Sequence, residues 1–233
     1  SSAAAVALIA AFSETYKKMG AIPLPRSKIA LLAHAVEQSV AGVPCGLQDQ
    51  LAAVYGGGKA WFWHGEVKGS CYKRKIVIKK KIHTDFARHL LLAYCGIPHE
   101  SKQINSRWIR QFVSGKQRNY WYEIIECVKT FVKSLSDGNY ETALVSMNRE
   151  TALRRRMTPE VLDEMGKKLV DVALKCECGA RFTGAGGGGC IWALGEKISI
   201  DRLRNDWKDI LGSRKAARLL QIEIDSKGVR KEK

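Results

Sequence analysis

The first forty residues place apolar side chains at helical spacing. A first helix is predicted from Ser1 to about Tyr16, and because it is apolar almost all round, we expect it to be buried. Pro23 and Pro25 interrupt the pattern, and Ser27 is the expected N-cap of a second helix. Four apolar residues of that helix fall on one stripe: Ile29, Leu32, Val36 and Val40.

A short third helix is predicted from about Gln48 to Val54, where three consecutive glycines begin at Gly56. Two runs with strand-like composition follow, at Ala60–Trp63 and Ile76–Ile82. Long helical patterns replace them from residue 84, so a domain boundary is predicted after residue 82, between domains 1–82 and 83–233.

The second half of the chain is predicted to be mainly helical, with short strands near its end. The expected helices are Thr84–Tyr94, Ser106–Val113, Gln117–Leu135, Tyr140–Leu153, one from a Thr158 N-cap and Pro159 to about Leu174, and Asp201–Leu211. The expected strands are Ala180–Thr183, Cys190–Leu194 and Leu219–Ile224. Short strands separated by long helices indicate an α+β architecture.

Composition narrows the possible classes of protein. The 233 residues are 45% hydrophobic, and no apolar run approaches the roughly 20 residues that a membrane-spanning helix needs, so we expect no membrane association. Seven scattered cysteines with one close pair, Cys176 and Cys178, do not indicate a zinc site or a disulfide framework. We therefore expect a reduced, cytoplasmic protein.

The formal net charge of +16 is compatible with nucleic acid, an anionic surface or phosphorylated small molecules. The densest basic run, residues 73–81, has an apolar centre and is interpreted as a surface strand with solvated ends.

A glycine-rich loop is expected between two of the strands. Five of the six residues from Gly184 to Gly189 are glycine, in the segment RFTGAGGGGC. Glycine loses the most backbone freedom on folding, so this density indicates positive φ angles or a close approach of the backbone to a ligand. Successive free amides in such a loop can bind an anion. A wide, flexible hairpin loop is the alternative.

Two acidic residues stand out near the second and third helices. Asp49 lies at the start of the short helix, where the helix dipole favours a carboxylate. Glu37 lies one helix earlier, and its helical neighbours include Ala30, Ala33 and Ala41, which leave space beside the carboxylate. A helix-capping acid and a surface glutamate are the alternative interpretations.

Three segments, taken together and in this order, resemble the GHMP small-molecule kinases, the family of galactokinase, homoserine kinase, mevalonate kinase and phosphomevalonate kinase. They are the opening Ser1-Ser2-Ala3-Ala4, the segment EQSVAGVPCGLQDQ from Glu37 to Gln50, and TGAGGGGC from Thr183 to Cys190. The middle segment looks closest to the galactokinase-like and heptose-phosphate kinases. The resemblance implies an incomplete N-terminal domain like the second domain of ribosomal protein S5, followed by a ferredoxin-like C-terminal domain.

The resemblance also implies an activity and a site. The activity is transfer of the γ-phosphoryl group of ATP to a hydroxyl of a sugar or sugar phosphate, the anomeric one by expectation. Ser1, Ser2 and Glu37 would hold Mg²⁺, and Asp49 would act as the catalytic base. The nucleotide would contact Ser1, Ser2 and the loop residues Gly184, Ala185, Gly186, Gly187, Gly188 and Gly189. In the family a glycine-rich segment precedes the two serines, so the chain looks like a kinase without its first third, and we expect it to have little activity alone.

Two alternatives remain open at this stage. One is a basic nucleic-acid-binding module, suggested by the charge and by Trp61, Trp63, Trp108 and Trp121, although it leaves the glycine loop unexplained. The other is a non-catalytic protein that keeps the fold. Three adjacent arginines, Arg154 to Arg156, could bind a substrate phosphate, but a solvated helix end is the expectation for them.

Overall fold

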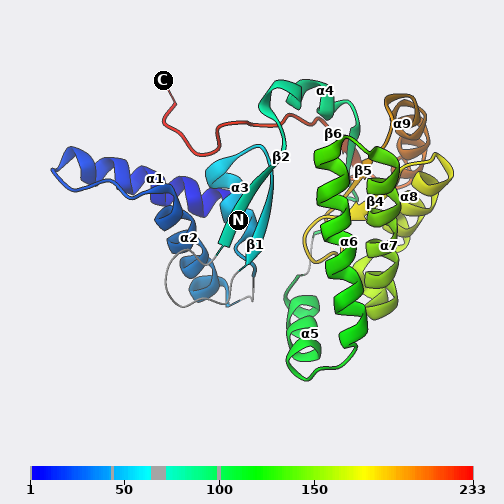
Figure 1. The fold of residues 1–233 in the computed structure, drawn as a ribbon, viewed down its shortest axis with the longest axis horizontal. Helices are drawn as coiled ribbons and strands as arrows, with labels where there is room; N and C mark the ends of the chain where they lie inside the picture. Colours follow the sequence, from blue (N-terminus) through cyan, green and yellow to red (C-terminus); the bar gives the residue numbers. More distant parts are fainter. Residues whose placement is uncertain (1, 43–44, 64–71, 99–100, 233) are drawn as a thin grey trace. The chain divides into compact units, whose positions relative to one another are not determined.

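The computed structural model describes residues 2–42, 45–63, 72–98 and 101–232 (Figure 1). It divides into two compact units, residues 1–83 with 224–233 and residues 84–223. The α+β fold class predicted from the sequence is confirmed. The assignment of the units to the two domains of a GHMP kinase stays a prediction.

The first unit contains three helices and a β-hairpin. The elements are α1 (Ser2–Lys18), α2 (Arg26–Ala41), α3 (Gln48–Tyr55), β1 (Gly58–Trp63), β2 (Tyr72–Ile78) and the 3-10 helix η1 (Lys80–Ile82). The strands pair antiparallel, with Trp61 opposite Arg74. The three helices enclose a small core formed by Val6, Ile9, Ile29, Ala30, Ala33, Leu47, Leu51 and Val54.

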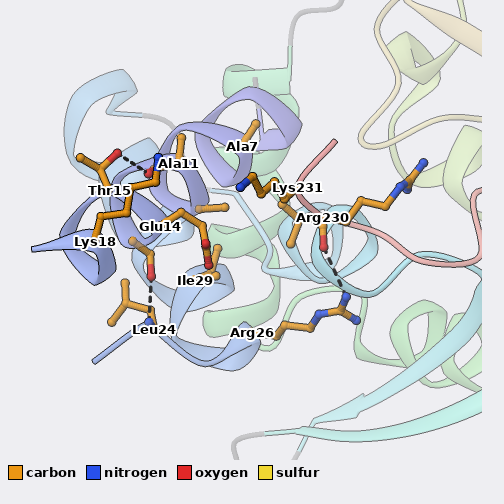
Figure 2. Close-up of a pocket in the computed structure, with 13 residues that line it drawn as sticks. Ala7, Ala11, Glu14, Thr15, Lys18, Leu24, Arg26, Ile29, Arg230 and Lys231 are labelled. Atoms are coloured by element: carbon orange, nitrogen blue, oxygen red, sulfur yellow. Dashed lines mark hydrogen bonds between the residues drawn. The ribbon is translucent and has the colours of Figure 1, made fainter. Parts of the chain in front are cut away.

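The last ten residues belong to the first unit, although the sequence placed them in the second domain. The amide of Val229 donates to the carbonyl oxygen of Ala53 at 2.9 Å, and the amide of Gly57 donates to that of Asp225 at 2.6 Å. The guanidinium of Arg26 on α2 donates to the carbonyl oxygen of Val229 at 3.3 Å, and this bond is the dashed line that starts at Arg26 in Figure 2. These contacts attach the C-terminal segment to α3, to the loop that follows it and to the start of α2.

The second unit is a four-stranded antiparallel sheet with helices. Its strands are β3 (Leu90–Tyr94), β4 (Gly179–Phe182), β5 (Cys190–Leu194) and β6 (Arg218–Leu220), in the order β4-β5-β3-β6. Its helices are α5 (Ser101–Val113), α6 (Arg118–Asp137), α7 (Tyr140–Met157), the 3-10 helix η2 (Pro159–Val161), α8 (Glu164–Lys175) and α9 (Lys197–Leu211), and α4 (His83–Ala87) begins at the boundary between the units.

A larger core lies between this sheet and helices α8 and α9. Its fully buried side chains include Leu91, Phe182, Leu169, Leu203 and Trp207. The indole of Trp207 donates to the carbonyl oxygen of Leu169 at 3.0 Å, which joins α9 to α8. Because β4 and β5 are neighbours in this sheet, the glycine loop between them has both ends fixed.

Several predicted elements differ in the structure. The helix expected over Thr84–Tyr94 is the short α4 followed by strand β3. The run Leu90-Leu91-Leu92 has no alternation that marks a strand, but hydrogen bonds to β5 and β6 on both sides select the extended form. Thr158 does not cap α8: the helix begins at Glu164, where the Asp163 carboxylate accepts from the amide of Gly166 at 2.8 Å.

The first two helices also differ from expectation. Pro25, and not Ser27, is the N-cap of α2. Helix α1 is not buried all round, because Leu8 is 58% and Phe12 54% exposed. On α2 the predicted apolar stripe points outward, apart from Ile29, because Ala30 and Ala33 allow the closest packing against the other helices. In the part of the chain that the structure describes, no helix is long and apolar enough to cross a membrane.

Candidate active site

Three helices bring polar side chains together at one end of the first unit. Ser2 is the first residue of α1, Glu37 lies in α2, and Gln50 lies in the first turn of α3. The hydroxyl of Ser2 donates to Oε2 of Glu37 at 2.7 Å. The side-chain amide of Gln50 donates to the same carboxylate oxygen at 2.7 Å and contacts Ser2 Oγ at 3.3 Å. The structure thus joins the predicted Ser2 and Glu37, which are 35 residues apart.

The loop before α3 is fixed against α2. The imidazole Nε2 of His34 donates to the carbonyl oxygen of Cys45 at 2.9 Å, and Nε2 of Gln38 donates to the same oxygen at 3.4 Å. Leu47 and Leu51 are buried in the core of this unit. These contacts determine where α3 begins and therefore where its first turn presents Asp49 and Gln50.

Asp49 lies in that first turn, as predicted, and it is exposed. Burial raises the pKa of the Cys45 thiol, and the negative charges of Glu37 and then Asp49 raise it further, while a hydrogen bond with Gln50 acts in the opposite direction. The charges of Glu37 and Asp49 therefore both raise the pKa of one thiol, that of Cys45. Asp49 is the exposed carboxylate of this cluster.

The donor set at Ser2 fits a magnesium ion. A hydroxyl and a carboxylate supply oxygen, the ligand atom that Mg²⁺ prefers. The side-chain oxygen Oε1 of the buried Gln50 has no hydrogen-bond partner within the described part of the chain. No group of three or more His, Cys, Asp or Glu residues suited to a metal occurs among the described residues. Mg²⁺ does not require one, because it usually keeps several waters and binds substrate phosphates through one or two carboxylates. The predicted ligand Ser1 lies outside the described residues.

The glycine loop lies in the second unit, between β4 and β5. The amide of Thr183 donates to the carbonyl oxygen of Cys190 at 2.9 Å and closes the loop. All five of its glycines, from Gly184 to Gly189, have positive φ angles, between 59° and 113°. The positive φ angles that the sequence predicted are therefore confirmed.

Part of the glycine content has a packing reason. The amide of Gly187 donates to the carbonyl oxygen of Val161 at 3.0 Å, and the amide of Gly189 donates to that of Ile97 at 3.1 Å. A Cβ on Gly186 would collide with the carbonyl oxygen of Val161, and one on Gly188 would collide with that of Pro98. The backbone approach that these glycines permit is therefore an approach to η2 and to the segment after β3 in the same unit.

Three amides of the loop have no acceptor from the described part of the protein. Within the described residues, no acceptor lies on the amides of Gly184, Ala185 and Gly188. The amides of Gly186, Gly187 and Gly189 donate to protein carbonyl groups. Of the six loop residues predicted to bind nucleotide, three thus use their amides within the protein, and of the other three Gly184 is exposed while Ala185 and Gly188 are buried.

A third group of polar residues was not identified from the sequence as one site. Glu150 on α7 accepts from Nε of Arg181 at 2.7 Å and from Nε of Arg154 at 2.9 Å. The guanidinium of Arg154 stacks on Trp108 at 4.3 Å and on Trp121 at 4.9 Å from the ring centroids. Arg154 is therefore not the solvated residue that was expected. The sequence feature that could have revealed this ion pair is the spacing of four residues between Glu150 and Arg154, which places both on one side of a helix.

The first unit also has a groove with a volume of about 540 Å³ (Figure 2). It lies between α1, the start of α2 and the C-terminal segment. Ala7, Ala10 and Ala11 are among its lining residues, and Ser2, Glu37 and Asp49 are not.

Comparisons with known proteins agree with the resemblance found in the sequence. Residues 1–57 match the family described as "GHMP kinases N terminal domain". A galactokinase of Thermococcus kodakarensis is 29% identical over 213 residues, which are 82% of this chain and 59% of that protein. A probable glucuronokinase 2 of Arabidopsis thaliana is 31% identical over 149 residues, 63% of this chain and 40% of that protein.

Among solved structures, the Lin0012 protein of Listeria innocua superposes with a TM-score of 0.74 at 18% identity, over 94% of this chain and 64% of that one. The chain spans between two fifths and three fifths of the length of the two relatives described above. The matched N-terminal segment, these relatives and this fold together support membership of the chain in the GHMP kinase family.

Proposed function

We propose that the protein is an ATP-dependent kinase that phosphorylates a hydroxyl group of a sugar or sugar phosphate. The observation that carries the proposal is the group of Ser2, Glu37 and Gln50 beside the exposed Asp49, in the segment matched to the family. The sugar relatives support a sugar acceptor, and an anomeric hydroxyl is the finer expectation.

Each residue has a proposed role in the transfer. The carboxylate of Asp49 accepts the proton of the attacking hydroxyl as its oxygen forms a bond to the γ-phosphorus, and the bond to the bridging oxygen breaks to release ADP. Ser2 and Glu37, with Ser1, are the proposed ligands of Mg²⁺, which neutralises charge on the phosphates when bound. Amides at the start of α1 attract phosphate through their unpaired N–H groups.

The amides of Gly184, Ala185 and Gly188 are the proposed further phosphate contacts, because backbone amides that donate to no protein acceptor can hold an anion without any side chain. Gly186, Gly187 and Gly189 then keep the loop in place, since their amides bind carbonyl groups of the same unit. The proposal therefore assigns nucleotide contacts to three of the six loop residues, where the sequence led us to expect all six.

The test is an assay of the full-length protein with Mg·ATP and a panel of sugars and sugar phosphates, with ADP release as the signal. Asp49→Asn should lower kcat by at least about 100-fold, because a positioned general base contributes about 10²–10⁴ in rate. ATP affinity, measured by calorimetry, should be nearly unchanged.

Glu37→Ala should raise the Mg²⁺ concentration needed for half-maximal rate. Wild-type turnover by the Asp49→Asn variant would contradict the role of the base, and an unchanged magnesium titration would contradict the role of Glu37. Absence of phosphorylation across the whole panel would count against the proposal as a whole.

A further inference from the structure

We propose that Gln50 is a positioning residue of the cation site, whose side-chain amide holds the Glu37 carboxylate and the Ser2 hydroxyl in one fixed arrangement. The inference rests on the proposed function and adds a residue to it. Gln50 is fully buried, with 0% of its surface exposed. It directly follows the proposed base, Asp49, in the chain.

The contacts of Gln50 join three helices at one point. Its Nε2 donates to Glu37 Oε2 at 2.7 Å and contacts Ser2 Oγ at 3.3 Å, while Ser2 Oγ itself donates to Glu37 Oε2 at 2.7 Å. One carboxylate oxygen therefore receives two donors, from α1 and from α3. A hydrogen bond to a charged group is short and directional, so this pair of donors fixes the orientation of the carboxylate.

The oxygen of the Gln50 side-chain amide argues against a purely structural role for this residue. Its Oε1 is buried and has no hydrogen-bond partner among the described residues. A buried acceptor without a partner costs folding stability, and a methionine of similar length would avoid that cost. The amide is therefore not the best choice for the stability of the core, although its N–H group is well placed for the carboxylate.

Gln50 and Asp49 are adjacent residues in the first turn of α3. Successive residues on a helix are about 100° apart, so the two side chains leave α3 in different directions. Asp49 is exposed, and Gln50 points into the contact between α1 and α2. The same helical turn thus presents the proposed base and holds the proposed metal ligands.

The experiment measures binding of Mn²⁺, in the presence of saturating ATP, to the full-length protein by electron paramagnetic resonance. Gln50→Met should weaken Mn²⁺ affinity by about 10–100-fold, the loss typical when a partner that orients a metal ligand is removed. Its melting temperature should stay close to that of the wild type, because the substitution removes a hydrogen bond and an unpaired acceptor together. Gln50→Glu should also weaken binding, because a carboxylate cannot donate to Glu37.

Gln48→Met is the matched control, since it makes the same substitution at an exposed position of the same helix turn, and Mn²⁺ affinity should be unchanged. Wild-type affinity in Gln50→Met overturns the inference. Retained affinity in Gln50→Glu with loss in Gln50→Met also overturns it, because the residue would then act through its oxygen.

If Gln50→Met unfolds, Gln50→Asn decides instead: it keeps the amide but withdraws it by one methylene, so retained affinity would overturn the inference. A wild-type protein that shows no ATP-dependent Mn²⁺ binding contradicts the proposed function itself, and the role of Gln50 falls with it.

Discussion

At the scale of single residues, the buried ion group around Glu150 shows how much depends on contacts that a sequence does not display. Glu150 is 6% exposed and binds Arg154 and Arg181, which come from the same helix and from β4. Arg181 also donates to the carbonyl oxygen of Phe182 at 2.7 Å, immediately before the glycine loop. The ion group therefore fixes the strand end from which that loop departs.

Replacement of Glu150 by glutamine should destabilise the second unit strongly. The substitution leaves two neighbouring arginines without their negative partner, and breaking a buried ion pair in this way costs about 3–5 kcal/mol. Glu123→Gln is the control, because Glu123 binds Arg149 at 2.8 Å in an exposed pair, which is worth at most about 1 kcal/mol. Urea denaturation at pH 7 measures both, and equal losses would contradict the prediction.

The same carboxyl predicts a dependence of stability on pH. Burial by itself raises the pKa of Glu150, but the charges and hydrogen bonds of Arg181 and Arg154 outweigh it and leave the pKa below its ordinary value of 4.5. A lowered pKa in the folded state contributes stability that is complete above the unfolded value and is lost as pH falls through the folded value. Urea midpoints measured from pH 7 down to pH 3 should therefore fall more for the wild type than for Glu150→Gln.

At the scale of elements, the glycines of the loop meet two requirements: positive φ angles and close approach of the backbone to neighbouring segments. The sequence did not show which glycine meets which requirement. The density of glycine predicted positive φ angles, and the structure confirms them. The amides of Gly187 and Gly189 donate to the carbonyl oxygens of Val161 and Ile97. Both partners lie far from the loop in the sequence. No local pattern marks those partners.

Two glycine substitutions separate backbone strain from collision. Gly138→Ala, at the end of α6, has φ of +75° and open space around the added Cβ, so it should cost only the strain of about 1–2 kcal/mol. Gly186→Ala has φ of +81° and also meets the Val161 carbonyl oxygen, so a further 1–3 kcal/mol or so is expected for the displaced backbone. Thermal or urea unfolding compares the two, and an equal loss would show that the loop moves freely away from Val161.

Element types were predicted best where the apolar spacing was long and regular. Helices α6, α7 and α9 appear close to their expected ranges, as do β4 and β5. Strand β3 was predicted as helix because a continuous apolar run has no period, and its pairing with β5 and β6 decided the outcome. Helix α8 begins later than predicted, because the side chain of Asp163, and not that of Thr158, accepts the hydrogen bond from a backbone amide of its first turn.

At the scale of the whole molecule, each unit has its own core, but the first leaves two apolar stripes uncovered. Spacing of four residues puts each stripe on one side of its helix. The stripes consist of Leu8, Phe12 and Tyr16 on α1 and of Leu32, Val36 and Val40 on α2, all of which are exposed. Apolar surface of this extent marks an interaction surface or an aggregation-prone site.

We expect this chain on its own to bind a hydrophobic dye and to associate with itself as its concentration rises. Leu8→Lys combined with Phe12→Lys should reduce both effects without loss of the helical circular dichroism signal, because neither side chain belongs to the core. Ile198→Lys, at a single exposed apolar residue of α9, is the control and should change neither. A monomeric chain without dye binding, measured by light scattering and fluorescence, would contradict the expectation.

The sequence by itself predicted the fold class, the resemblance to the GHMP kinases and the residues proposed for catalysis, because helical spacing, glycine density and short motifs are local properties of the chain. Tertiary structure alone decided that Gln50 bridges Ser2 and Glu37, that Arg154 stacks between two tryptophans, and that half of the loop amides bind carbonyl groups. Apart from the bond of the Gly186 amide to Thr183 inside the loop, each of these contacts joins residues from different parts of the chain. Such contacts depend on how elements pack, and packing is set by the whole set of side chains at once and not by any one segment.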